Sequence, residues 1–89
     1  MYLTLQDCID MSELSEDEVL AIAEHEGLPE VVALEMGNYM IHEPGGSLRI
    51  KRMIEDDIRD ARERGDRRHS AALKRVLKHY IDEHAVVAD

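Results

Sequence analysis

The chain has 89 residues, a formal net charge of −9 at pH 7, no Trp, no Phe and a single cysteine, Cys8. This length predicts one domain, the acidic balance disfavours free association with nucleic acid or anionic membranes, and a lone cysteine excludes an intrachain disulfide. No apolar run approaches the roughly 20 residues needed to span a bilayer. The N-terminal stretch MYLTLQDCID has no basic residue and is not typical of a signal peptide, so we expect a cytoplasmic protein without membrane contacts.

The charges are segregated along the chain. Residues 1–48 contain eleven acids and no Lys or Arg, whereas all eleven basic residues lie between Arg49 and Lys78. This split predicts either two surfaces of opposite sign within one fold or a self-complementary pair of subunits.

No stretch has the two-residue alternation of a strand, and the apolar spacing predicts helices throughout. Thr4 suits the N-cap of a short helix over LQDCIDM, and Ser15 with Glu18 has the capping-box spacing that starts a second helix at about Glu16. The apolar positions of this second helix are Val19, Leu20, Ile22 and Ala23. Gly27 then ends it, because glycine readily adopts the left-handed conformation that follows a helix.

The third predicted helix, residues 29–42, is apolar almost all round. A helix without a polar face belongs in the middle of a fold, so we expect this one to be central and the most buried. Gly37 lies inside it, and we favour an unbroken helix over a break at Gly37 and Asn38.

The loop at 43–46 precedes a fourth helix, predicted over 48–64 with Ser47 as its N-cap. Gly65 ends that helix and Asp66 caps a fifth, predicted over 67–84, so the last two helices form an antiparallel hairpin. The expected fold is a compact all-α bundle of four or five helices, with residues 1–84 as one domain and a frayed tail at 85–89.

The stretch AIAEHEGLP has the spacing of a helix-turn-helix, with Ala23, Gly27 and Leu28 at the small, turn and apolar positions. Glu26, however, stands where that motif buries an apolar residue, and the would-be recognition helix has no Lys or Arg. Because DNA affinity depends on neutralising phosphates, we interpret the stretch as a helical corner and not as a DNA reader.

Metal ligation and catalysis have little support in the residue pattern. No Glu-x-x-His occurs, and Asp66-x-x-His69, which has a related spacing, uses Asp66 as a cap. Asp56 and Asp57 are expected on a solvated face, and Cys8 has no basic neighbour in sequence that would activate its thiol. We therefore expect a non-enzymatic protein with no cofactor and no metal.

Residues 62–68 read RERGDRR and crowd four arginines at the predicted hairpin tip. Positive charge in the first turn of a helix opposes the helix dipole, so Arg67 and Arg68 are poorly explained by helix stability. Arg side chains bind carboxylates and phosphates well. The candidate site for an anion or an acidic partner is Arg62, Arg64, Arg67, Arg68 and Arg75, weighed against a simple solvated turn.

Two stretches, IAEHEGLPEVVALEMGNYMIHEPGG and RIKRMIEDDIRDARERGD, resemble a group of small, uncharacterised bacterial proteins of about this length. The resemblance implies a small all-helical bacterial protein and no particular activity.

We therefore expect a non-enzymatic helical interaction module, an adaptor or regulator, whose partner is a protein and in the simplest case a second copy of the chain. The alternative is a nucleic-acid-associated regulator that uses the basic surface at 62–78 on a helix-turn-helix-like scaffold.

Overall fold

The computed structural model describes residues 3–84, so the predicted frayed tail at 85–89 lies outside the described residues. Within this range the chain forms five α-helices and no strands, which confirms the all-α bundle. The helices are α1 (Leu5–Asp10), α2 (Glu16–Glu26), α3 (Glu30–Ile41), α4 (Gly46–Glu63) and α5 (Arg67–His84). No helix among these residues is long and apolar enough to cross a membrane.

Local signals place most of the helix ends. The Thr4 and Ser15 hydroxyls accept hydrogen bonds from the backbone N–H groups three residues later. The Asp7 and Glu18 carboxylates in turn accept hydrogen bonds from the backbone N–H groups of Thr4 and Ser15, so both capping boxes are complete. The Asp66 carboxylate accepts from the His69 N–H at the start of α5. These bonds satisfy backbone donors that have no partner inside the helix.

The corner between α2 and α3 forms as the sequence predicts. Gly27 has a φ of 67° and ends α2 in the left-handed conformation. Helix α3 then continues without a break through Gly37, which is buried because the side chains of Leu14 and Ile22 pack where a Cβ would stand. The glycine therefore allows a close approach to α2.

The expectation that the third helix is the most buried element is wrong. Its inner side buries Ala33, Leu34 and Met40, but Val31 and Val32 on its outer side are exposed and Tyr39 is 69% exposed. Helix α3 packs against α2 and α4 on its inner side, and no helix among residues 3–84 covers Val31, Val32 and Tyr39. Helix α4 buries more residues than any other described helix.

The start of α4 also differs from the prediction. Ser47 is not the N-cap; the helix begins at Gly46, after Gly45 in the left-handed conformation with a φ of 76°. Gly46 lies against the backbone carbonyl of Met40, where a Cβ would not fit. The carbonyl of Ser47 instead accepts a hydrogen bond from the Tyr80 hydroxyl at 2.9 Å, which ties the end of α5 to the start of α4.

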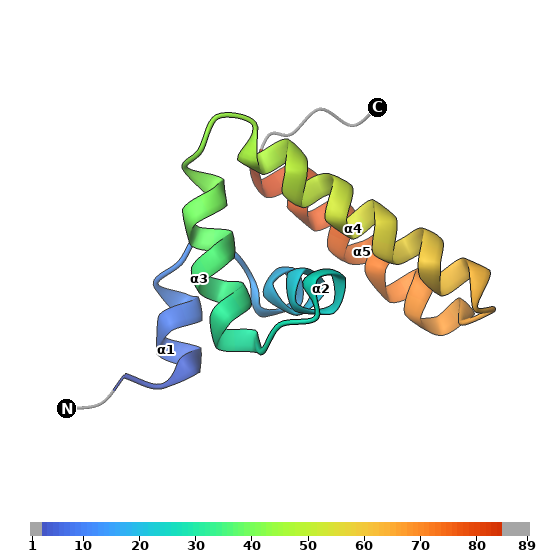
Figure 1. Ribbon diagram of the computed structural model, residues 1–89, viewed down its shortest axis with the longest axis horizontal. Helices are drawn as coiled ribbons and strands as arrows, with labels where there is room; N and C mark the ends of the chain where they lie inside the picture. The colour runs from blue at the N-terminus through green and yellow to red at the C-terminus, as the bar shows by residue number, and fades with distance from the viewer. Residues whose placement is uncertain (1–2, 85–89) are drawn as a thin grey trace.

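Helices α4 and α5 run side by side as a long hairpin, and α2 packs across both (Figure 1). The molecule measures 44 × 25 × 19 Å along its principal axes. Helices α1 and α3 lie toward one end of it, and the loop between α4 and α5 projects at the opposite end (Figure 1). The core lies where α2, α3 and α4 meet, around Val19, Ile22, Ile50 and Ile54.

Candidate functional site

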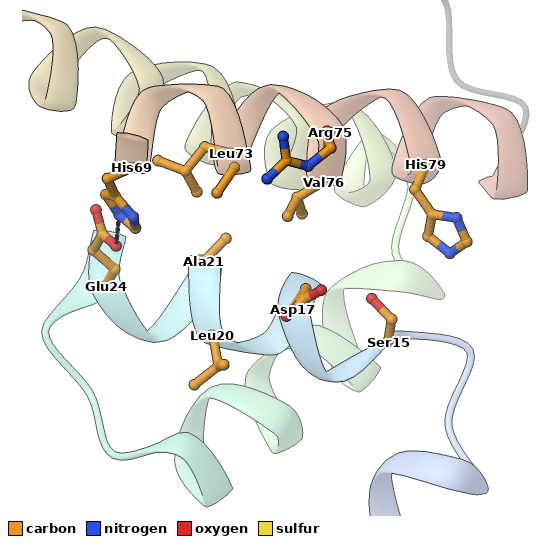
Figure 2. A pocket seen from close by; sticks show the side chains of 11 residues that line it. Ser15, Asp17, Leu20, Ala21, Glu24, His69, Leu73, Arg75, Val76 and His79 are labelled. Carbon is orange, nitrogen blue, oxygen red and sulfur yellow. Dashed lines mark hydrogen bonds and ion pairs between the residues drawn. The ribbon is translucent and has the colours of Figure 1, made fainter. Parts of the chain in front are cut away.

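A groove runs between α2 and α5, with a volume of about 410 Å³. Figure 2 shows Ala21 of α2 facing Leu73 and Val76 of α5 across it. Its rim carries Asp17 and Arg75 among other polar groups, and the full lining is Ser15, Asp17, Leu20, Ala21, Glu24, His69, Ala72, Leu73, Arg75, Val76 and His79. An apolar floor with a few polar groups around it is the usual chemistry of a binding groove.

A hydrogen bond between His69 of α5 and Glu24 of α2 closes one end of the groove. The His69 Nε2 atom lies 2.6 Å from the Glu24 Oε1 atom, so α5 and α2 are joined there (Figure 2). The next residue of α2 is His25, whose ring contacts two carboxylates, Glu26 at 2.7 Å and Asp56 of α4 at 3.1 Å. Partial burial lowers the pKa of His25, but the hydrogen bonds to Glu26 and Asp56 outweigh it and raise the pKa above its usual value.

Asp57 corrects the expectation that the paired acids lie on a solvated face. Asp56 is half-exposed, but Asp57 is only 2% exposed and its Oδ2 atom has no hydrogen-bond partner among the described residues. Burial, reinforced by the negative charge of Glu24, raises the pKa of Asp57 to about 7. The 3.6-residue period predicts this burial, because Asp57 lies three residues after Ile54 and four before Ala61, on the buried side of α4.

A second buried polar group lies near the other end of α5. Glu18 is 1% exposed; its carboxylate accepts from the Ser15 N–H and lies 3.6 Å from the His84 Nε2 atom. The Tyr80 ring packs against the His84 ring in a tilted arrangement, with the ring centroids 4.5 Å apart. Burial, with a smaller effect from Glu18, raises the pKa of Tyr80 to about 12, against the hydrogen bond to Ser47. These contacts attach α5 to α2 and α4 and do not open onto the groove.

The structure separates the five arginines that the sequence grouped together. Arg62 and Arg67 line one hollow at the hairpin tip with Lys74, which lies within the predicted basic surface at 62–78 but is not one of the five candidate arginines. Arg75 lines the groove on another side of α5. Arg64 and Arg68 are exposed and line neither cavity. Helical periodicity could have found Lys74, because it lies seven residues, about two turns, after Arg67.

The remaining candidates have the following positions. Cys8 is half-buried against the core and is a free thiol. Within residues 3–84 no three His, Cys, Asp or Glu side chains are arranged to hold a metal ion. Asp66 acts as the cap of α5, and His69 pairs with Glu24.

Comparisons of the chain with protein-family models, curated proteins and solved structures find no match. The resemblance to small bacterial helical proteins therefore stays a prediction. The surfaces of the described residues that bear on function are the groove, the hairpin tip and the exposed side of α3.

Proposed function

We propose that the protein is a non-enzymatic interaction module, an adaptor or regulator that works by protein contacts, and that a second copy of the chain is its first partner. The observation that carries this proposal is the open groove between α2 and α5, whose floor is formed by apolar side chains of both helices. Apolar surface left in water favours association with another apolar surface.

The exposed side of α3 has the properties that such a groove requires. Val31, Glu35 and Tyr39 follow one another at four-residue spacing, Val32 lies beside them, and all four are exposed. This face is apolar with one carboxylate, whereas Arg75 is the one Lys or Arg that lines the groove. Docking of α3 from one copy into the groove of another would bring Glu35 toward Arg75, a pairing of opposite charges.

A twofold dimer would make this contact twice, because each copy offers both surfaces. Such an arrangement also uses the charge split of the sequence, since α3 belongs to the acidic half and α5 to the basic one. Exposed charge pairs are screened by salt. We therefore expect self-association that weakens as the salt concentration rises.

The test is a charge exchange measured by light scattering after gel filtration at low and high salt. The wild type is expected to exceed the monomer mass at low salt and to approach it at high salt. Glu35→Arg and Arg75→Glu should each weaken association, because each places like charges together, and the double variant should restore it. A wild-type monomer at both salts and at high protein concentration would overturn the proposed self-association.

The nucleic-acid alternative has less support. A phosphate backbone is bound by cations that follow one continuous track, but Arg67 and Lys74 lie on a different side of α5 from Arg75. Arg75 is therefore separated from the basic residues of the hairpin tip, although Lys78 lines a further hollow of α5 together with Lys74.

A further inference from the structure

The hollow at the hairpin tip is formed by two helices and the turn between them. We call it the tip hollow; it has a volume of about 420 Å³ and is lined by Arg62, Gly65, Arg67, Ser70, Ala71 and Lys74. Arg62 comes from the last turn of α4, whereas Arg67 and Lys74 come from the first turns of α5. Gly65 and Ala71 are small, so the space between the three cations stays open.

The tip hollow concentrates positive charge without a compensating carboxylate. No acidic side chain lines it, although Glu63 and Asp66 are close in sequence, and the Asp66 carboxylate is bonded to the His69 N–H. Within residues 3–84, Arg62, Arg67 and Lys74 form no ion pair. Three cations from two helices therefore border one cavity and have their charges available.

The position of the tip hollow also removes it from much of the acidic surface. The hairpin tip and helices α1 and α3 lie toward opposite ends of a molecule that is 44 Å long (Figure 1). Charges separated by more than about 8 Å are largely screened at physiological salt. An anion at the tip therefore experiences the nearby cations more strongly than the net charge of −9.

We propose that the tip hollow binds a small phosphate-bearing anion, either inorganic pyrophosphate or the diphosphate of a nucleotide. Arg side chains donate paired hydrogen bonds to phosphate oxygens, and Lys adds a compact charge. A diphosphate presents oxygens in several directions and can meet cations from both helices. This site is independent of the proposed self-association, which uses α3 and the groove.

Arg67 and Arg68 provide a closely matched pair for the test. They are neighbours in the first turn of α5, both are exposed, and the positive charge of each opposes the helix dipole. Only Arg67 lines the tip hollow. Replacing either by Gln removes one charge from nearly the same place, so a difference between the two variants reports the site and not the general electrostatics.

Binding of pyrophosphate to the full chain would be measured by calorimetry and by backbone amide NMR shifts at constant ionic strength. We expect saturable binding, with Arg67→Gln and Lys74→Gln each weakening it by about five- to tenfold and Arg68→Gln by less than twofold. The amides that shift should be those between Arg62 and Lys74. Absence of saturation below 10 mM, or equal losses in Arg67→Gln and Arg68→Gln, would overturn the proposal.

Two further probes distinguish the source of the phosphate. ADP that binds more tightly than pyrophosphate, with the same loss in Arg67→Gln, would identify a nucleotide, whereas equal affinities would show that the phosphates alone are recognised. A short single-stranded DNA is the third probe. Tighter binding of DNA, with similar losses in Arg67→Gln, Arg68→Gln and Arg75→Gln, would replace the small-anion site by an extended nucleic-acid surface.

Discussion

Asp57 is the side chain whose ionisation has the clearest consequence for stability. It is buried in α4 and faces Glu24 and His25 of α2, with Asp56 and Asp60 nearby on its own helix. Its pKa of about 7 compares with about 3.9 in an unfolded chain. The folded state therefore holds this proton more tightly, and folding becomes less favourable as the pH rises from about 4 to 7.

We predict that the protein is more stable at pH 5.5 than at pH 8. The raised pKa of His25 acts in the same direction, because its stabilising contribution is present below about 6.5 and is lost as the pH rises through its folded pKa. Asp57→Asn should raise the free energy of unfolding at pH 8 by about 1–3 kcal/mol, and by about half as much at pH 5.5, which lies midway between the unfolded and folded pKa values.

Urea unfolding at the two pH values measures both effects. Asp60→Asn is the control, because it removes an exposed carboxylate from the same helix. A wild type that is more stable at pH 8, or equal gains from both variants, would contradict the burial argument.

At the level of the helices, the turn between α3 and α4 depends on two adjacent glycines for different reasons. A Cβ at Gly46 would overlap the backbone carbonyl of Met40, whereas a Cβ at Gly45 would meet nothing but would suffer the strain of a φ of 76°. We predict that Gly46→Ala lowers the free energy of unfolding by about 2–3 kcal/mol and Gly45→Ala by about 1 kcal/mol. Thermal or urea unfolding of the two variants measures these losses of stability. Equal losses would contradict the close approach of α3 and α4 at Gly46.

The helix boundaries show how far local chemistry predicts the structure. The N-cap at Thr4, the capping box at Ser15, the turn at Gly27 and the cap at Asp66 are confirmed, because each depends on bonds within a few residues. The predicted cap at Ser47 is wrong, because α4 begins one residue earlier, at Gly46, which lies against the backbone carbonyl of Met40. That contact joins two elements and has no local signature.

At the scale of the whole molecule, the hairpin depends on the helices that precede it. Ile50 and Ile54 of α4 are fully buried, and α2 and α3 cover the hairpin on this side. We predict that a fragment of residues 45–84, at micromolar concentration, loses most of its helical circular dichroism and its cooperative thermal transition. Exposure of this apolar face removes the main stabilisation of an amphipathic helix pair. A fragment that keeps a cooperative transition would show that the hairpin folds alone.

The sequence by itself determined the helical content, most of the caps and the segregation of charge, because periodicity, capping and composition are properties of short stretches. The tertiary structure decided which faces are covered: it left the outer side of α3 exposed, buried Asp57, and placed Lys74 with Arg62 and Arg67 while directing Arg75 into the groove. The physical reason is that burial and clustering depend on which helices lie beside one another. The packing of the whole chain decides which residues become neighbours in space, and the sequence of one helix does not show which helix will lie beside it.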